Sequence, residues 1–476
     1  MNLSIEPKEV FKWFYEINQI PRESHHEEKI SEFLVNFAKE RNLEVIQDKA
    51  LNVIIKKKAS EGYENSKTLI IQGHMDMVCV KDENSNHDFG KDPIEMYVED
   101  GWLRAKGTTL GADDGIAVAF ALAILDDSSL KHPPLEVLIT TAEETTMGGA
   151  GAIEKGLLKG DMLLNIDSEE EGIFLVSCAG GTSVEVNFEI ERDEFDARPI
   201  KISIKGLSGG HSGSEIIKEK ANANILLGRV LDKLREKFDL RIIHIKGGSK
   251  HNAIADGASA DILLKDEKYA REVIEKLEKE LQEEFFKTDS NLRIEVTQSE
   301  IEESYTKELT NKIIDYLLLT PNGVCAMSKD IDNLVETSLN VAIIEEDEEV
   351  LKILTSIRSS RKSHIELISK KIQVLAKALG GEFKKGLGYP AWQFEKDSAL
   401  RDIALKTFKE VMGTDAKYEA IHAGIECGIL KEVLPNCDML SYGPDILGAH
   451  SPEERLSIKS TENMWKFTKK LLENLK

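Results

Sequence analysis

The chain has 476 residues, too many for a single hydrophobic core, so we expect two or three domains. Its 41% hydrophobic and 31% charged residues are typical of a globular protein in water. The formal net charge of -23 disfavours binding to nucleic acid or to an anionic lipid surface, so neither partner is expected.

Neither a membrane span nor a secretion leader is predicted. No apolar run approaches the roughly 20 residues that a spanning helix needs, and residues 1–12 mix both signs of charge with apolar side chains. The five cysteines are scattered and lack the CxxC spacing of metal or redox sites, which favours reduced thiols. We therefore expect a cytoplasmic protein without membrane association.

The N-terminal part of the chain predicts an α/β domain. Apolar residues recur at helical spacing within residues 6–41, which predicts two helices. The remaining elements are predicted strands at 51–55, 68–72, 135–141 and 162–166, and a predicted helix at 115–125. Helices alternating with apolar strands are typical of a mostly parallel sheet with helices on both faces.

The pattern changes near residue 195 and changes back near residue 385. Residues 198–205 alternate between apolar and polar side chains, as a half-exposed strand does, and two rounds of helices and strands follow. We interpret residues 196–385 as an inserted α+β domain of about two tandem units. Residues 1–195 and 386–476 would then form the two parts of the α/β domain.

Residues able to bind metal follow several of the predicted strands. In open α/β sheets, functional side chains gather in the loops beyond the carboxyl ends of the strands. By this rule, separate loops would bring together His74, Asp76, Asp113, Glu143, Glu144, Asp167 and His450. Mixed nitrogen and oxygen ligands suit zinc or a similar divalent ion. The pattern therefore predicts the site of a two-metal hydrolase.

Each short motif has a second interpretation when it is considered alone. Asp76 would share a face with His74 and could fix its tautomer, but a buried histidine satisfied by a neighbour is equally consistent. An aspartate before the 115–125 helix could bridge two cations or cap the helix. Glu143 and Glu144 repel each other unless a cation is present, so one could bind metal while the other acts as a general base. A solvated charge pair is the alternative.

Two histidines are weaker signals on their own. His450 precedes Ser-Pro, which indicates a rigid loop, and alone it suits a structural role better than a ligand. His211 lies among glycines in the inserted domain, so it could cover the site and stabilise an oxyanion. A solvent-exposed histidine in a turn is the alternative.

In combination, longer motifs resemble the di-zinc peptidase superfamily that includes carboxypeptidase G, aminoacylase and the bacterial dipeptidases. Within it, the chain resembles the aminoacyl-histidine dipeptidase (Xaa-His dipeptidase, carnosinase-type) branch nearly end to end. The motifs are Gly73-His-Met-Asp-Met-Val78, Thr109-Leu-Gly-Ala-Asp-Asp-Gly115, Asn165-Ile-Asp-Ser-Glu-Glu-Glu-Gly172, Gly206-Leu-Ser-Gly-Gly-His-Ser-Gly213, Asn322-Gly-Val324, Ile421-His-Ala-Gly-Ile-Glu-Cys-Gly428 and His450-Ser-Pro-Glu-Glu-Arg455.

The resemblance implies two Zn2+ ions as cofactors, with Mn2+ or Co2+ as alternatives. The implied ligands are His74 and Asp167 for one ion, Glu144 and His450 for the other, and Asp113 as the bridge between them. The peptide bond from the bridging residue to Asp114 is often cis in these relatives. Asp76 would orient the first histidine, and Glu143 would be the general base.

The relatives interrupt the catalytic domain with a lid domain, which agrees with the pattern changes near 195 and 385. His211 would be the lid histidine, and the sequence leaves open whether it acts in its own chain or in the partner chain of a homodimer. Asn252 and Arg358 resemble lid residues that hold the substrate carboxylate. Glu426 is a weaker candidate for binding the substrate amine.

The expected reaction is hydrolysis of the peptide bond of dipeptides, Xaa-His and other short peptides included. Two divalent ions about 3.5–4 Å apart would activate a water molecule. Glu143 would take its proton, and His211 would share the oxyanion charge. Two alternatives stay open. An amidohydrolase of N-acyl amino acids would use the same ions without an amine site, and a noncatalytic metal-binding protein would not need a free glutamate.

Overall fold

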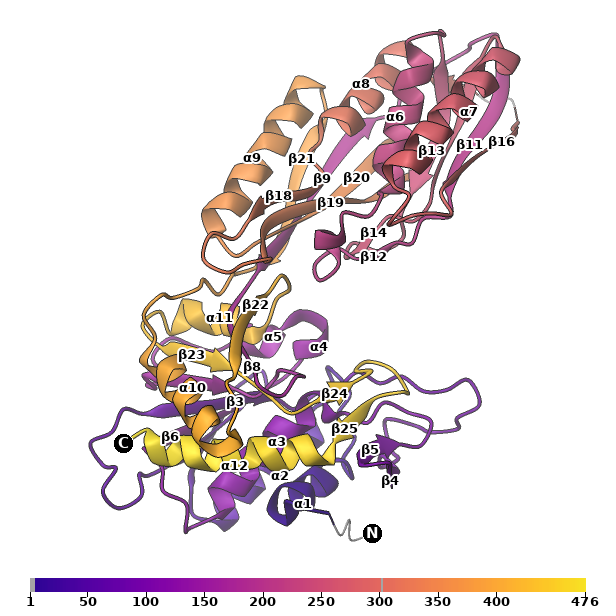
Figure 1. The fold of residues 1–476 in the computed structure, drawn as a ribbon. Helices are drawn as coiled ribbons and strands as arrows, with labels where there is room; N and C mark the ends of the chain where they lie inside the picture. The colour runs from indigo at the N-terminus through magenta and orange to yellow at the C-terminus, as the bar shows by residue number, and fades with distance from the viewer. Residues whose placement is uncertain (1–4, 301–302) are drawn as a thin grey trace. The chain divides into compact units, whose positions relative to one another are not determined.

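The computed structural model describes residues 5–300 and 303–476, which form two compact units (Figure 1). Unit 1 comprises Met1–Ser177, Phe394–Ala420 and Ile425–Lys476, and unit 2 comprises Cys178–Gln393 and Ile421–Gly424. The chain therefore contributes to unit 2 twice, first as a long insertion and then as a short segment. The inserted domain expected at 196–385 lies within unit 2.

Unit 1 is built on an eight-stranded sheet with the order β1-β2-β6-β3-β7-β23-β8-β22. Its strands are β1 (Glu44–Gln47), β2 (Val53–Lys57), β3 (Leu69–His74), β6 (Leu135–Thr140), β7 (Met162–Asn165), β8 (Ile173–Cys178), β22 (Lys417–Ile421) and β23 (Asp438–Ser441). The central strands β6, β3, β7 and β23 run parallel. β1 pairs antiparallel with β2, β2 with β6, and β8 with β23. The expected mostly parallel sheet is confirmed.

Helices cover both faces of this sheet. In Figure 1, α3 (Ala112–Asp126) and α12 (Ile458–Asn474) lie on one side, and α5 (Gly148–Gly151) and α11 (Glu426–Val433) on the other. The sequence of α3 is apolar all round from Gly115 to Leu125, as a helix buried on every side requires. The remaining helices of unit 1 are α1 (Lys8–Ile17), α2 (Glu28–Glu40), α4 (Glu143–Thr146) and α10 (Ala399–Met412).

Unit 1 also contains a four-stranded sheet with the order β24-β25-β5-β4. Its strands, which the sequence did not predict, are β4 (Met96–Glu99), β5 (Trp102–Ala105), β24 (Ile446–Leu447) and β25 (Arg455–Ser457). β25 pairs antiparallel with both β24 and β5. The loop between β24 and β25 contains His450, so this small sheet anchors that histidine.

Unit 2 is built on a nine-stranded sheet with the order β16-β11-β15-β13-β19-β20-β9-β21, and β18 also pairs with β19. The strands are β9 (Gly180–Glu189), β11 (Arg198–Lys205), β13 (Arg241–Gly247), β15 (Ala258–Leu264), β16 (Arg293–Gln298), β18 (Gly323–Met327), β19 (Val335–Glu346), β20 (Val350–Ser359) and β21 (Glu382–Tyr389). Their pairings are antiparallel. β13 and β19 pair at Gly247 and Ile344, which joins two halves of the sheet.

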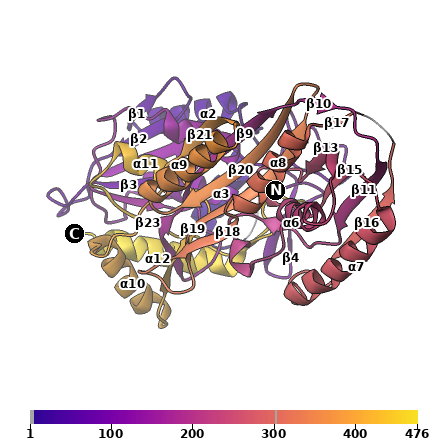
Figure 2. The ribbon, with the colours of Figure 1, turned by 90° about the horizontal axis from the view of Figure 1, so that it is seen from above.

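Helices of unit 2 lie across its sheet, as the view in Figure 2 shows. They are α6 (Ala223–Arg235), α7 (Glu267–Glu284), α8 (Lys307–Leu319) and α9 (Lys362–Ala378). α6 and α7 contact the half that contains β11 and β16, and α9 contacts the half that contains β20 and β21. One apolar core, with members such as Ile202, Leu227 and Ile353, joins strands and helices. The expected insertion of about two α+β units is confirmed.

Two short strands complete the part of unit 2 that bears on the site. β12 (Gly210–His211) pairs antiparallel with β14 (Ala253–Ile254). The other short pair is β10 (Arg192–Asp193) with β17 (Ser304–Tyr305).

Within the described residues, no helix combines the length and the apolarity that a membrane crossing requires.

Candidate metal and active site

The candidate residues of unit 1 come together beyond the carboxyl ends of its parallel strands. His74 ends β3, Glu143 and Glu144 begin the short helix after β6, and Asp167 follows β7. Asp113 lies at the start of α3. The strand-end rule therefore places five residues from four segments at one edge of the sheet, as the sequence predicted.

Asp113 presents one carboxylate oxygen to each of two imidazoles. Its Oδ1 lies 3.3 Å from Nε2 of His74, and its Oδ2 lies 3.0 Å from Nε2 of His450. His450 Nε2 is also 2.9 Å from Oε2 of Glu144, and His74 Nε2 is 3.7 Å from Oδ1 of Asp167. The predicted ligand set thus forms a continuous row of potential ligand atoms. The peptide bond between Asp113 and Asp114 is cis, as the resemblance implied.

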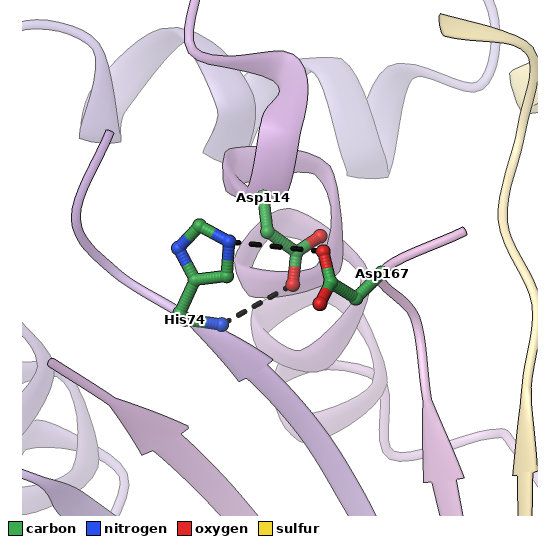
Figure 3. Close-up of side chains that lie close together, drawn as sticks. All are labelled: His74, Asp114 and Asp167. Carbon is green, nitrogen blue, oxygen red and sulfur yellow. Dashed lines mark hydrogen bonds and ion pairs between the residues drawn. The ribbon is translucent and has the colours of Figure 1, made fainter. Parts of the chain in front are cut away.

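Among the residues that the structure describes, two groups of three side chains have ligand atoms within 4.8 Å of one another. One consists of His74, Asp113 and Glu144, and the other of His74, Asp114 and Asp167. Figure 3 shows the second group, with the imidazole of His74 facing Asp167. Asp114 was not predicted as a ligand. Its Oδ2 accepts the main-chain N–H of His74 (3.2 Å), so its carboxylate is bonded to the end of β3.

A glycine is needed where Asp114 approaches β3. A Cβ atom on Gly73 would lie 2.4 Å from Cβ of Ala117 and 2.5 Å from Oδ2 of Asp114. Both distances are far below van der Waals contact, so any larger residue would push α3 away from the strand. The glycine that precedes His74 in the sequence motif is thus explained by helix packing.

Asp76 supports both the histidine and the glutamate pair. Nδ1 of His74 lies 3.1 Å from the main-chain oxygen of Asp76 and 3.5 Å from its Oδ1. The Asp76 carboxylate also accepts the main-chain N–H groups of Glu143 (3.1 Å) and Glu144 (3.3 Å) and the hydroxyl of Ser24 (2.8 Å). Burial opposes its ionisation, but the interactions with His74 and Ser24 lower the pKa of Asp76 to about 2.

The cluster carries more negative charge than its burial tolerates. Burial raises the pKa of Asp167 to about 6 and raises the pKa of Glu143 well above its ordinary value. Hydrogen bonds to Asp113 and Glu144 raise the pKa of His450 to about 11. Each of these shifts indicates that additional positive charge near the carboxylates would stabilise the cluster. A divalent cation among the carboxylates would supply it.

The donor atoms fit such a cation. Oε1 of Glu144 is buried and has no hydrogen-bond partner among the described residues. Buried carboxylate oxygens rarely remain unpaired unless an ion or water completes them. Two imidazoles with carboxylate oxygens are the ligands that zinc and similar divalent ions take in hydrolases. Glu143 belongs to neither group of three, and its Oε2 lies 3.9 Å from Nε2 of His74.

Glu426, the candidate for binding an amine, is completely buried in unit 1. Its Oε2 accepts hydrogen bonds from Gln72 on β3 (2.5 Å) and Thr140 on β6 (2.7 Å), and its Oε1 has no partner among the described residues. Burial raises the pKa of Glu426 to about 8. The carboxyl group therefore lies between the two strands that lead to His74 and Glu143.

The lid candidates lie together in unit 2. His211 on β12 faces Ala253 on β14, and the main-chain N–H of Ser212 donates to the carbonyl of Asn252 (2.8 Å). The main-chain N–H groups of Gly213 (3.3 Å) and Ser214 (3.1 Å) donate to Nδ1 of His211. Burial and the nearby Arg358 lower the pKa of His211. Because two N–H groups donate to Nδ1, that nitrogen carries no proton, so the ring is neutral with its proton on Nε2.

Arg358 lies on β20 within a polar group that the sequence did not predict. Its Nη1 donates to the hydroxyl of Tyr389 (2.7 Å), and its Nε is buried without a partner among the described residues. Ser338, its neighbour in register on β19, hydrogen-bonds to Nε2 of His422 (2.7 Å). The only sequence signal for His422 was its place in the 421–428 motif, which does not indicate a partner.

Comparison with known proteins places this geometry among metallopeptidases. Residues 70–474 match the model of peptidase family M20/M25/M40. The chain is 37% identical over 476 residues to the cytosol non-specific dipeptidase of Escherichia coli (strain K12), covering 99% of this chain and 98% of the relative. It superimposes on the aminoacylhistidine dipeptidase of Vibrio alginolyticus with a TM-score of 0.93 and 37% identity, covering 99% and 98% of the two chains. An aminopeptidase of Bacillus cereus shares the fold, with a TM-score of 0.57 and 15% identity.

Proposed function

The chain belongs to peptidase family M20/M25/M40, and we propose that it is a two-metal dipeptidase that hydrolyses Xaa-His and other short dipeptides. One observation carries the proposal. A buried row of carboxylates and imidazoles, with an unpaired Glu144 oxygen, lies at the strand ends of a fold shared with a dipeptidase. Such a row is unstable without cations, and cations there would face a free glutamate.

Two divalent ions, zinc by preference, would be held by the predicted set. The ligands would be His74, Asp113, Glu144, Asp167 and His450, with Asp113 shared because its two oxygens face different histidines. When bound, such ions polarise the scissile carbonyl and acidify the attacking water. Asp76 would hold His74 in one tautomer through the contacts of its Nδ1.

Glu143 would be the general base. Its main-chain N–H donates to Asp76, and its carboxylate belongs to neither ligand group although Oε2 lies 3.9 Å from Nε2 of His74. Burial raises its pKa, so it would accept a proton from the attacking water more readily than an exposed glutamate would. The same group would then return the proton to the leaving amine.

His211 would donate a hydrogen bond to the oxyanion. Because two N–H groups donate to its Nδ1, the other ring nitrogen carries the proton and is a donor. A hydrogen-bond donor suits this task because it stabilises the negative charge that develops on the oxyanion. We propose this role for the lid domain at 196–385, whether His211 serves its own chain or a partner's.

The substrate carboxylate would bind Arg358 and Asn252. A guanidinium whose Nε is buried without a partner is a ready donor for an anion. For Glu426, binding of the substrate amine stays a prediction. Its complete burial between Gln72 and Thr140 favours a supporting role at β3 and β6 instead.

The test is a substrate panel with the purified full-length chain. Metal-free protein is incubated with Zn2+, Mn2+ or Co2+ and then with β-Ala-His, dipeptides with other C-terminal residues, and N-acetyl amino acids. Hydrolysis of the dipeptides, lost with a chelator and restored by metal, is expected. Cleavage of the acetylated compounds alone would indicate an amidohydrolase, and metal binding without turnover a noncatalytic protein.

The compartment and the assembly follow from the same proposal. The E. coli relative is named a cytosol dipeptidase, and we propose a cytoplasmic location for this chain too. A homodimer remains a prediction that light scattering of the purified protein will decide.

A further inference from the structure

A buried arginine joins two of the loops that carry candidate ligands. Arg22 is 2% exposed and lies just after α1. Its Nη1 donates to the main-chain oxygens of Met75 (3.1 Å) and Asp76 (3.2 Å), directly after His74. Its Nη2 donates to the main-chain oxygen of Gly111 (2.6 Å), two residues before the bridging candidate. One guanidinium thus binds the end of β3 and the loop before α3 at once.

Glu454 binds that same loop. Its Oε2 accepts the N–H groups of Leu110 (2.7 Å) and Gly111 (2.9 Å), and its Oε1 accepts those of Ala112 (2.7 Å) and Asp113 (3.3 Å). Four successive amides therefore converge on one carboxylate that is 2% exposed. Glu454 follows His450 in the loop between β24 and β25, so it also ties that loop to the bridging aspartate.

The two glycines around Asp113 make room for the arginine. A Cβ atom on Gly111 would lie 2.3 Å from Nη2 of Arg22, and one on Gly115 would lie 2.7 Å from the same atom. Glycine at these positions lets another group approach the backbone closely. Here the group that approaches the two glycines is the guanidinium of Arg22. Its four hydrogen bonds hold it in place, so it could not move aside for a larger residue.

We propose that Arg22 and Glu454 are positioning residues that hold Asp113 between His74 and His450, so that the site binds metal tightly. This inference rests on the proposed function. Carboxylates crowded at the buried edge of the sheet repel one another. Their side chains stay in position only if the main chain that carries them is also held in place. Arginine suits this position better than lysine because its planar donors reach several carbonyls in fixed directions.

The test measures zinc affinity rather than activity. Metal-free Arg22→Lys, Glu454→Gln and Gly115→Ala chains are titrated with zinc against a chromophoric chelator. We expect affinity to fall by about 10–100-fold in the first two, as for other residues that support metal ligands. Gly115→Ala should weaken binding too, although alanine favours a helix over glycine. The controls are Glu453→Gln, at an 80% exposed neighbour, and Arg41→Lys, whose arginine binds Asp126 at the surface.

The outcomes separate the two proposals. A purely structural role would lower the melting temperature of the metal-free variants and leave zinc affinity equal to that of the controls, which would overturn the inference alone. A wild-type chain that binds no zinc would overturn the proposed function as well. If Arg22→Lys does not fold, as circular dichroism would reveal, Gly115→Ala and Glu454→Gln decide the question, since wild-type affinity in both rejects the inference.

Discussion

The two units each contain a buried polar group, and the two groups have opposite electrostatic demands. In unit 1 the carboxylates dominate, so burial raises the pKa of Asp167 to about 6 and hydrogen bonds raise that of His450 to about 11. In unit 2, burial lowers the pKa of His422 to about 4, and the positive charge of Arg358 acts in the same direction. A cation would therefore stabilise the first group, and an anion the second.

This difference follows from where each group lies in its sheet. Parallel strands end at one edge, and their loops can deliver acidic residues from distant parts of the sequence to one point. In the antiparallel sheet of unit 2, neighbours in register such as Ser338 and Arg358 lie side by side within the strands. Four predictions test this contrast.

The largest effect is expected at the free glutamate of unit 1. Glu143→Gln keeps the shape but removes the base, so kcat should fall by about 10²–10⁴-fold. Zinc content per chain, measured by mass spectrometry, should stay at the wild-type value. Glu170→Gln, at an exposed glutamate in the loop after β7, is the matched control. Near-normal turnover in Glu143→Gln would remove it as the base.

The next effect concerns the neutral histidine of unit 2. His211→Ala should lower kcat by about 10²–10³-fold, since one oxyanion donor is lost. Zinc content and KM should change little because the residue holds no metal. His251→Ala, at an exposed histidine of the same unit, serves as the control. Steady-state kinetics identical to wild type would count against the oxyanion role.

A smaller effect is expected at Arg358, whose Nε has no hydrogen-bond partner among the described residues. Arg358→Lys keeps the charge but loses the planar pair of donors, so kcat/KM for dipeptides should fall by about 10–100-fold. Dipeptide amides, which lack the carboxylate, should be affected much less. Arg361→Lys, close by in unit 2, controls for general effects. Equal losses for acids and amides would contradict the proposed clamp.

The smallest effect concerns stability rather than turnover. His422 has a folded pKa of about 4 against an ordinary value of 6.5, so between these pH values only the unfolded chain takes up the proton. Wild-type stability should therefore fall as the pH drops from 6.5 to 4. His422→Gln lacks this loss, and its melting temperature relative to wild type should rise by about 2–4 °C across that window. A constant difference would show that the histidine does not titrate there.

Much of unit 1 could be predicted from the sequence because burial leaves a clear signal. β3, β6 and β7 are buried along their length, so they are mainly apolar runs followed at once by polar residues. With the strand-end rule, this pattern was sufficient to bring His74, Glu144 and Asp167 together. Helices α1 and α2 were equally clear from their apolar spacing.

Other features leave no local signal. Arg22 contacts Gly111 across 89 positions and Glu454 contacts Leu110 across 344, and neither residue type suggests burial in a sequence. The short strands β24 and β25 have too few residues for an alternating pattern. β9 begins with two glycines, which are typical of turns rather than strands. In each case a distant partner, rather than the local pattern, decides the structure.

The small sheet β24-β25-β5-β4 has a consequence for biosynthesis. β24 and β25, the two strands that come last in the sequence, flank the loop that contains both His450 and Glu454. Until the ribosome has synthesised this loop, the polypeptide lacks one imidazole and the carboxylate that binds four main-chain amides. Under the proposed function, a chain truncated before β24 would therefore lack both a candidate metal ligand and the residue that holds the loop of Asp113.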